Sequence, residues 1–435
     1  MALCVFPVVE ADGYEAGFTI WALPTGRLAS GIVVDSRGVW YACLSGHVGH
    51  LVPNTNAFEE WTIGSPEGDS ALHLDSFQGS IYFTDDRGNK IGKLLPSADK
   101  VSFATIPTSD SGPVGIEFPK WMLAEHPVLY FTEHRANAIG SLTLGGLVFD
   151  LLLSAPRSTS TGTPTFSLAA PEILNVMPRF TLGGPATTPG VAIVSEVISG
   201  SFSEWHTPSA GSPSMLTTGD GSVWFSVAKG AQIGKLTFQD GPDRFDIYYL
   251  PPTSMYSWDV KLDSAGNVWY TYPKGNIIGR LEPSTSTVNE WTVRTPGSAP
   301  LSLAIDHTGM IWFTELGKIG MLDPYKNKFY EWPVPTVPGD PYKPIPAGLF
   351  IDSGDNVWFT DSGGAMWSGV GCLNRNGQMV PEFPVNMLII IVAASVVVIT
   401  RLKVKLMRKS SVLSFRTEAE RVNSYCFVCE CKGIT

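Results

Sequence analysis

Residues Ser298–Trp332, SAPLSLAIDHTGMIWFTELGKIGMLDPYKNKFYEW, contain the pattern that decides the fold. The runs LSLAID, MIWFTE, KIGMLD and KFYEW are rich in aliphatic and aromatic residues, and short sequences with Asp, Gly, Pro and Asn separate them. Aliphatic β-branched and aromatic residues favour strands, whereas Asp, Asn, Gly and Pro favour turns. The stretch therefore predicts four short β-strands joined by tight turns.

Copies of this unit fill most of the chain. The second strand, IWFT, has the counterparts VWYA, IYFT, LYFT, VWFS, VWYT and VWFT, and the third strand carries an Ile/Val-Gly pair. The glycines of that pair lie at positions 49, 92, 140, 234, 279, 320 and 371. Six intervals of 43, 48, 94, 45, 41 and 51 residues separate them. This spacing gives seven clear repeats.

The interval of 94 residues is about two repeats long. Within it, TFSLAAP (165–171), RFTLGG (179–184), GVAIVSEV (190–197) and SFSEWHTP (201–208) resemble a degenerate copy of the four strands. We therefore expect a degenerate eighth repeat. The alternative is a long insertion in the third repeat, which the polar run Arg157–Thr165 also suits.

Four-stranded units of 40–50 residues in seven or eight copies predict an all-β fold, a β-propeller over residues 17–385 after an N-terminal segment, 1–16. Gly17–Pro24, GFTIWALP, resembles a lone fourth strand and is expected to complete the last blade. Each third-strand glycine is expected to let an aromatic ring of the adjacent blade approach the backbone.

The propeller repeats are followed by an apolar run, Met387–Thr400, and then by the basic sequence RLKVKLMRK. Snorkelling of the basic side chains extends this run toward the length that spans a bilayer, so we predict a transmembrane helix at 386–406. The basic flank predicts a single-pass membrane protein with a cytoplasmic tail, 407–435, and an extracytoplasmic propeller. The alternatives are a buried strand, or a tail anchor that leaves the propeller in the cytoplasm.

The charge distribution limits the classes of partner. Residues 401–435 carry eight Lys/Arg and three Glu, which leaves 22 Lys/Arg against 37 Asp/Glu in residues 1–400. No basic stripe with interleaved aromatic residues is present in the body of the chain. Nucleic acid is therefore not expected as a partner, and the acidic body favours cationic partners or metal ions.

The repeat W-F-T-[ED]…I-G-[KR]-[LI]…E-[WY] resembles the streptogramin B lyase (virginiamycin B lyase) family of β-propellers over about Gly17–Val385. The resemblance implies metal-assisted elimination of a cyclic ester, with magnesium held by the Glu of a Glu-Pro-His and by the Glu that ends Trp-Phe-Thr-Glu, and with the His as base. In this chain Glu315 matches the second Glu, whereas Ala299 and Leu301 stand at the first Glu and at the His.

Carboxylates also end the second strand in four repeats, at Asp85, Glu133, Glu315 and Asp361. Equivalent positions form a ring, so the pair Glu315 and Asp361 and the pair Asp85 and Glu133 are each expected in adjacent blades. Two neighbouring carboxylates are candidate ligands for Mg²⁺ or Ca²⁺. His134, beside Glu133, is a candidate substitute base. The alternative is that these carboxylates accept hydrogen bonds from turns.

Loss of the His and of the first Glu favours a membrane-anchored binding or recognition module for a small molecule or a surface partner. Whether the chain is an enzyme stays open at this point. The alternative functions are a metal-dependent lyase or hydrolase that acts on a cyclic ester such as a streptogramin, and a structural surface protein that presents its loops.

Overall fold

The computed structural model describes residues 3–5, 9–11, 14–23, 28–63, 71–121, 127–144, 198, 200–208, 211–228, 230–238, 242–251, 257–336, 343–363 and 368–374. All of them belong to the first of two compact units, Met1–Val380. The predicted transmembrane segment, 386–406, and the tail, 407–435, lie outside the described residues. Among the described residues, no helix is long and apolar enough to cross a membrane.

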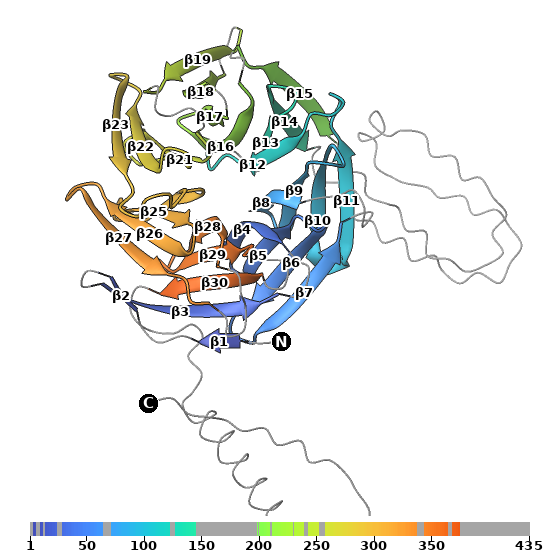
Figure 1. Ribbon diagram of the computed structural model, residues 1–435. Coiled ribbons are helices and arrows are strands. Elements are labelled where there is room, and N and C mark those ends of the chain that lie inside the picture. The colour runs from blue at the N-terminus through green and yellow to red at the C-terminus, as the bar shows by residue number, and fades with distance from the viewer. Residues whose placement is uncertain are drawn as a thin grey trace, which may run out of the picture. The chain divides into compact units, whose positions relative to one another are not determined.

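The described residues form seven antiparallel sheets arranged as the blades of a propeller (Figure 1), so the predicted all-β propeller is confirmed. Blades 1 to 3 consist of β4 (Ala29–Asp35), β5 (Gly38–Cys43), β6 (His47–Val52) and β7 (Ala57–Thr62); β8 (Ala71–Phe77), β9 (Ser80–Asp85), β10 (Lys90–Leu95) and β11 (Lys100–Thr105); and β12 (Pro113–Glu117), β13 (Val128–Glu133), β14 (Ala138–Leu144) and β15 (Gly200–His206).

Blades 4 to 6 consist of β16 (Pro213–Gly219), β17 (Ser222–Val227), β18 (Gln232–Thr237) and β19 (Arg244–Tyr249); β20 (Val260–Leu262), β21 (Val268–Tyr272), β22 (Ile277–Glu282) and β23 (Thr287–Thr292); and β24 (Leu303–Ile305), β25 (Ile311–Glu315), β26 (Lys318–Asp323) and β27 (Lys328–Pro333). Blade 7 consists of β28 (Pro346–Ile351), β29 (Val357–Asp361), β30 (Gly369–Asn374) and the N-terminal β3 (Tyr14–Ala22), which β1 (Leu3–Val5) and β2 (Val9–Ala11) flank. A 3-10 turn, η1 (Pro96–Ala98), precedes β11.

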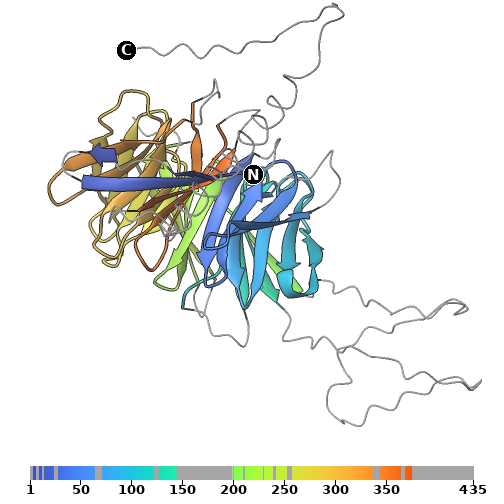
Figure 2. The same cartoon turned by 90° about the horizontal axis from the view of Figure 1, so that it is seen from below.

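The N-terminal strand closes the ring, as predicted. β3 pairs antiparallel with β30 from Gly17 opposite Asn374 to Ala22 opposite Gly369. Figure 2 shows β3 lying along the side of the molecule next to strands from the other end of the chain. The last blade therefore joins the two ends of the propeller sequence.

The predicted eighth blade is wrong. The run 201–208 supplies β15, which pairs with β14 as the fourth strand of blade 3. The inner strands of blades 3 and 4, β12 and β16, contact each other directly, so these blades are neighbours. The other runs assigned to an eighth repeat, from 165 to 197, lie outside the described residues. Residues 145–199 are instead an insertion in the sequence between the third and fourth strands of blade 3, which was the alternative.

Side-chain hydroxyls join the blades near the axis. In six blades a Thr or Ser of the second strand donates to a backbone carbonyl in, or two residues before, the first strand of the next blade. These bonds are Thr84 to Val114 (2.8 Å), Thr132 to Ser214 (2.5 Å), Ser226 to Trp258 (2.6 Å), Thr271 to Leu301 (2.7 Å), Thr314 to Ala347 (3.3 Å) and Thr360 to Ser30 (2.7 Å). The small residue of the second-strand pattern therefore holds neighbouring blades together.

Each third-strand glycine makes room for an aromatic ring, but the ring comes from its own blade. A Cβ at Gly320 would lie 2.2 Å from Cζ of Phe313, which is opposite it in β25. At Gly92 the corresponding distance to Phe83 is 2.1 Å. The expectation that the ring belongs to the adjacent blade is therefore wrong, because the second-strand ring lies flat across its paired strand.

Candidate functional site

The second strands end, and the first strands begin, at the same end of the propeller. The register places Ala29 opposite Cys43 and Pro346 opposite Asp361, and the other blades with a long first strand repeat this pairing. We call this end the mouth. The four carboxylates that the sequence singled out, the apolar residues described below and one opening of the axial channel all lie there.

Two of the four carboxylates cap turns in their own blades. Asp361 Oδ1 accepts hydrogen bonds from the backbone N–H groups of Ile345 (2.7 Å) and Gly363 (2.9 Å). Asp85 Oδ1 accepts one from Gly88 N–H (3.0 Å). Both side chains are buried. The sequence left two roles open for Asp85 and Asp361, a metal ligand or an acceptor of hydrogen bonds from turns. In the structure both residues form the turn contact.

Glu133 and Glu315 have a different environment. Both are buried, and none of the described residues forms a hydrogen bond with their carboxylate oxygens. Desolvation, together with the neighbouring charge of Glu204, raises the pKa of Glu133 to about 8. Desolvation and the charge of Glu331 raise the pKa of Glu315 to about 7. Each glutamate thus lies beside a carboxylate of its own blade.

A serine that is hydrogen-bonded to an asparagine lies beside each of the two glutamates. A hydrogen bond from the Ser111 hydroxyl would lower the pKa of Glu133. This hydroxyl donates its hydrogen to Asn89 Oδ1 instead (2.8 Å). In blade 6 the Ser298 hydroxyl donates to Asn276 Oδ1 in the same way (2.7 Å). Since both hydroxyl hydrogens are used, the serines cannot also donate to a carboxylate. A neutral carboxyl group is the form that suits both sites.

No group of three or more His, Cys, Asp or Glu side chains that could hold a metal ion occurs in the described part of the chain. The proposed pairs, Glu315 with Asp361 and Asp85 with Glu133, therefore remain predictions. His134 is half-buried, and its Nδ1 lies 3.0 Å from the carbonyl oxygen of Pro213. A hydrogen bond at this distance makes Nδ1 the protonated nitrogen.

The positions that match the Glu-Pro-His of the resemblance lie at the mouth of blade 6. Ala299 adopts a positive φ of 52°, and its N–H group donates to Asn276 Oδ1 (3.2 Å). Leu301 N–H donates to the carbonyl of Thr314, next to Glu315 (3.0 Å). Neither alkyl side chain can bind a cation or accept a proton.

Exposed apolar side chains gather on consecutive blades at the mouth. Of the eight large hydrophobic residues that are exposed in the described part of the chain, five lie there, exposed by 37% to 53%: Trp258 of blade 5, Leu316 of blade 6, Ile345 of blade 7, and Leu28 and Leu44 of blade 1. Backbone hydrogen bonds join Leu44 to Leu28 (2.9 Å) and Gly317 to Pro344 (3.0 Å). We call these five residues the apolar arc.

Charged residues occupy the mouth on blades 2 and 3. Asp86 and His134 follow the second strands where Leu44 and Leu316 stand in blades 1 and 6. The Arg135 guanidinium bridges Asp86 (2.6 Å) and Asp110 (2.7 Å). The mouth thus has an apolar half and a polar half.

The first strands, which surround the axis, also differ in charge from blade to blade. Asp75, Glu117 and Lys261 occupy one position of the first strands of blades 2, 3 and 5, directly after the core residue that pairs with the second-strand aromatic. At that position blades 1, 6 and 7 have Val33, Ala304 and Phe350. These charges lie toward the end of the propeller opposite the mouth, because they pair with residues near the starts of the second strands.

The charges in the channel influence one another. Desolvation and the Lys261 ammonium lower the pKa of His73 to about 4. Desolvation and Glu117 raise that of Asp75 to about 7. The pKa of Lys261 is raised because Asp259 (3.5 Å away), Glu117 and Asp75 outweigh desolvation. These side chains are partly accessible although protein surrounds them, as expected for the lining of a narrow channel.

Sequence reasoning missed this channel cluster. The signal was available, because HLD, GIE and DVKL place charged residues in strands whose counterparts elsewhere have the uncharged residues Val33, Thr217, Ala304 and Phe350. Aligning the first strands on their core residue would have shown that these charges share one level of the channel.

Comparison with known proteins agrees with the fold. A model of the virginiamycin B lyase family matches residues 191–387, which contain β15 of blade 3, blades 4 to 6 and the first three strands of blade 7. No curated protein matches the sequence.

Solved structures show the same fold. A streptogramin B lyase structure superimposes with a TM-score of 0.61 and 22% identity, covering 82% of this chain and 97% of its own. A catalytically inactive His-to-Ala variant of virginiamycin B lyase from Staphylococcus aureus, solved with quinupristin, gives 0.60 and 21%, covering 83% and 99%. The extracellular domain of a hybrid two-component system from B. thetaiotaomicron gives 0.52 and 15%, covering 81% and 40%. The chain is thus a virginiamycin-B-lyase-like β-propeller.

Proposed function

We propose that this propeller is a binding module whose mouth takes a streptogramin-type cyclic ester without opening it. The observation that carries the proposal is the apolar arc, because large exposed hydrophobic residues on consecutive blades mark an interaction site. The polar half of the mouth supplies hydrogen-bonding groups for the other side of the ligand. A ligand with one apolar and one amide-rich face matches this arrangement.

Binding is favoured over elimination by the residues at the matched positions. Acidifying a C–H bond next to a carbonyl requires a Lewis acid and a base near neutral pH. Ala299 and Leu301 supply neither group. The competing function, a metal-dependent lyase that uses Glu315 and His134, would require Glu315 to ionise beside Glu331 and His134 to act through Nε2.

Isothermal titration calorimetry, in which quinupristin is added to the full chain in the presence of Mg²⁺, tests the proposal. We expect saturable binding that Leu316→Asp weakens by about 1–3 kcal/mol, because the substitution places a carboxylate against an apolar ligand surface. Tyr325→Asp is the matched control, since Tyr325 is 77% exposed in the turn between the third and fourth strands of the same blade. Absence of saturable binding, or equal loss in both variants, would refute this function.

The proposal includes display of the propeller on a membrane through residues 386–406. Ala394→Arg, a charge near the middle of the apolar run, is expected to move the chain from the membrane fraction to the soluble fraction after alkaline carbonate washing. Ser411→Arg lies beyond the run and is the control. An unchanged membrane fraction in Ala394→Arg would contradict the anchor.

A further inference from the structure

The residue that directly follows the second strand of each blade lies at the mouth. Asp86 of blade 2 pairs with Arg135 (2.6 Å), and the Ser362 hydroxyl of blade 7 donates to the carbonyl of Ile345 (3.2 Å). His134 occupies this position in blade 3. The other four members of the ring have apolar side chains: Leu44, Ala228, Pro273 and Leu316. His134 therefore differs in chemistry from every equivalent residue.

Protein contacts hold His134 in one orientation. Its backbone N–H group donates to the carbonyl of Gly112 (2.9 Å), and the N–H group of the next residue, Arg135, donates to the carbonyl of Ser111 (2.9 Å). The ring donates through Nδ1 to the carbonyl of Pro213 (3.0 Å), the first residue of β16 in blade 4. The backbone and the ring are both fixed before a ligand arrives, so binding costs little side-chain entropy.

The other ring nitrogen, Nε2, is left as an acceptor. In a neutral imidazole one nitrogen carries the hydrogen and the other accepts a hydrogen bond. Because Nδ1 carries the hydrogen, Nε2 has the free lone pair. None of the described residues forms a hydrogen bond with Nε2, and the half-buried ring leaves this atom accessible. His134 thus presents one directed acceptor at the mouth.

The order of the blades places this acceptor across the mouth from the apolar arc. In a ring of seven blades, the two that lie farthest from blade 3 are blades 6 and 7. These blades carry Leu316 and Ile345 of the apolar arc. A ligand that lies over the axial opening therefore meets apolar side chains at one edge and His134 Nε2 at the other.

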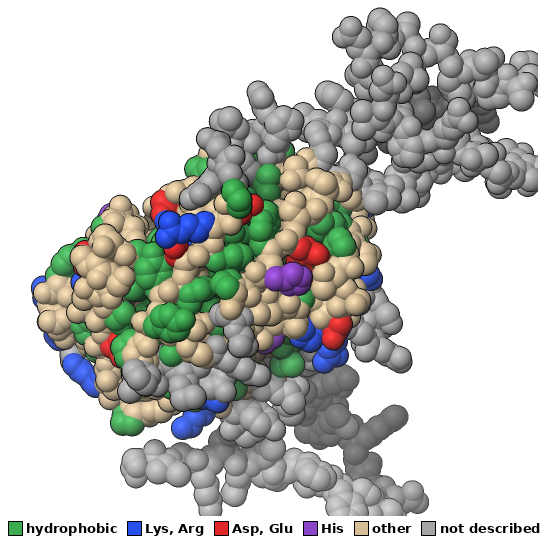
Figure 3. Space-filling model, turned by 90° about the horizontal axis from the view of Figure 1, so that it is seen from above, with side chains coloured by type: hydrophobic (Ala, Val, Ile, Leu, Met, Phe, Trp, Pro, Cys, Tyr) green, Lys and Arg blue, Asp and Glu red, His purple; other side chains and the backbone are tan. Residues whose placement is uncertain are grey.

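Apolar contact alone does not select the position or the orientation of a ligand. Figure 3, which views the propeller from the top of Figure 1, shows hydrophobic side chains gathered in a band on that side as well. A hydrogen bond, in contrast, requires its donor to lie in one direction from the acceptor. His134 Nε2 supplies such a direction at the mouth.

We propose that His134 Nε2 accepts a hydrogen bond from an N–H or O–H group of the ligand at the mouth, and so selects ligands that carry this donor on the edge opposite their apolar face. The inference rests on the function proposed above. An amide-rich cyclic ester has N–H groups of this kind. A ligand without the donor would bury Nε2 without a partner, which weakens binding.

Two variants of His134 separate the acceptor from the structural contact. In His134→Asn the amide N–H takes the place of Nδ1 and can still donate to Pro213, but no atom stands at the place of Nε2. In His134→Gln the amide oxygen reaches the place of Nε2, whereas the contact with Pro213 is lost. Isothermal titration calorimetry with quinupristin and the full chain, at a pH of about 8 where imidazole is neutral, measures the affinity. We expect His134→Asn to bind about tenfold more weakly than the native chain, and more weakly than His134→Gln.

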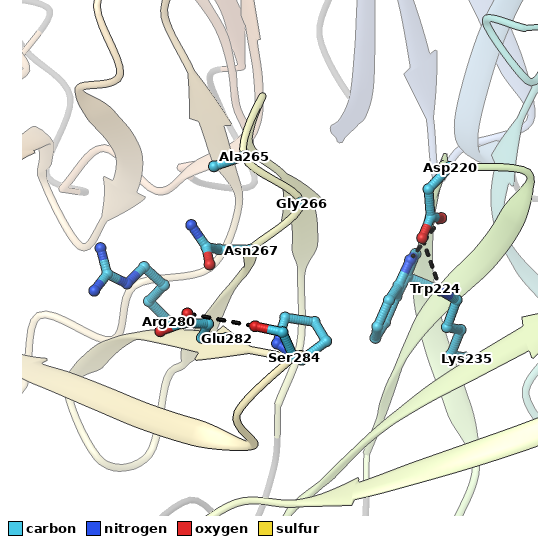
Figure 4. Close-up of a pocket in the computed structure, with 10 residues that line it drawn as sticks. Asp220, Trp224, Lys235, Ala265, Gly266, Asn267, Arg280, Glu282 and Ser284 are labelled. Atoms are coloured by element: carbon cyan, nitrogen blue, oxygen red, sulfur yellow. Dashed lines mark hydrogen bonds and ion pairs between the residues drawn. The ribbon is translucent and has the colours of Figure 1, made fainter.

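Two further variants are controls. His206→Asn is the matched substitution, because the exposed His206 ends β15, the fourth strand of the same blade. Ser284→Trp tests the location of the ligand. Ser284 lines a hollow of about 480 Å³ between blades 4 and 5, opposite Asp220, Trp224 and Lys235 (Figure 4), and an indole would fill it. Neither control should change the affinity for quinupristin.

The outcomes distinguish this inference from the function on which it rests. Equal affinity of the native chain and His134→Asn, or tighter binding by His134→Asn than by His134→Gln, would overturn the inference and leave the function standing. Absence of binding by the native chain, or loss of binding in Ser284→Trp, would overturn both. His134→Asn keeps the contact with Pro213, so its melting temperature should equal that of the native chain.

Discussion

Replacing Gly320 by alanine is expected to lower the free energy of unfolding by about 3 kcal/mol or more. The new Cβ would lie 2.2 Å from Cζ of Phe313, a fully buried ring in the paired strand, so a core aromatic must move. Urea denaturation measures the change. The ring cannot turn aside because neighbouring core residues surround it on both faces of the blade.

A double variant separates overpacking from other effects. Phe313→Leu removes the ring that the Cβ meets, so Gly320→Ala should cost less in the Phe313→Leu background than in the native chain. Gly317→Ala in the same blade is the control. Gly317 has a φ of +77° with nothing within 4 Å of an added Cβ, so only a backbone cost of about 1–2 kcal/mol is expected. Additive costs for Phe313→Leu and Gly320→Ala would contradict the packing explanation.

Glu133→Gln is expected to stabilise the chain at neutral pH. An ordinary glutamate with a pKa of 4.5 is charged in the unfolded chain, whereas the folded pKa is about 8. Below pH 4.5 both states hold the proton and Glu133 costs nothing. Between pH 4.5 and 8 the folded state alone holds it, and stability falls by about 1.4 kcal/mol per pH unit, to a cost of about 3 kcal/mol at pH 7.

Glutamine copies the neutral carboxyl group and removes this dependence. The difference in unfolding free energy between Glu133→Gln and the native chain should be near zero at pH 4 and large at pH 7. Glu204→Gln is the control, because Glu204 accepts hydrogen bonds from Thr108 N–H (3.2 Å) and the Thr108 hydroxyl (2.8 Å), so that variant should destabilise. A native chain that is more stable than Glu133→Gln at pH 7 would show that Glu133 is ionised and paired.

Local sequence patterns predicted the blades well because each strand is specified by its own residues. The run MIWFTE contains β25, and KIGMLD forms β26. The aspartates of the turns accept hydrogen bonds from backbone N–H groups, as expected: Asp306 Oδ1 accepts from Thr308 N–H (2.9 Å) and Met310 N–H (3.0 Å). The prediction of an eighth repeat was wrong because the pairing of a strand is not specified by its own residues. A run such as GVAIVSEV has strand-like composition, but composition does not determine its pairing partner.

The functional site was predicted less completely. Equivalent positions were correctly placed at one end of the ring, yet the sequence could not tell that Asp361 caps a turn while Glu315 faces Glu331 of its own blade. The two side chains differ by one methylene group, and Glu331 belongs to the fourth strand of the blade, which the second-strand pattern does not include. The apolar arc was also missed, since Leu28 and Leu316 are separate single residues in the sequence that only the circular arrangement brings to one side of the mouth.

Contacts between blades show a third limit. Trp291 looks like an ordinary fourth-strand aromatic residue, and Asn327 like an ordinary turn residue. Only the three-dimensional structure shows that the indole N–H of Trp291 donates to Asn327 Oδ1 of the next blade (2.9 Å).

The fate of bound quinupristin is the most direct test of the central claim that the mouth binds without opening the ring. An eliminative opening leaves the mass unchanged, so the ligand must be examined by reversed-phase chromatography as well as by mass spectrometry. After prolonged incubation of a saturated complex with Mg²⁺, the account predicts a single peak with the retention time of intact quinupristin. A second peak of equal mass that grows with time, and that Glu315→Gln abolishes, would contradict it and establish a lyase.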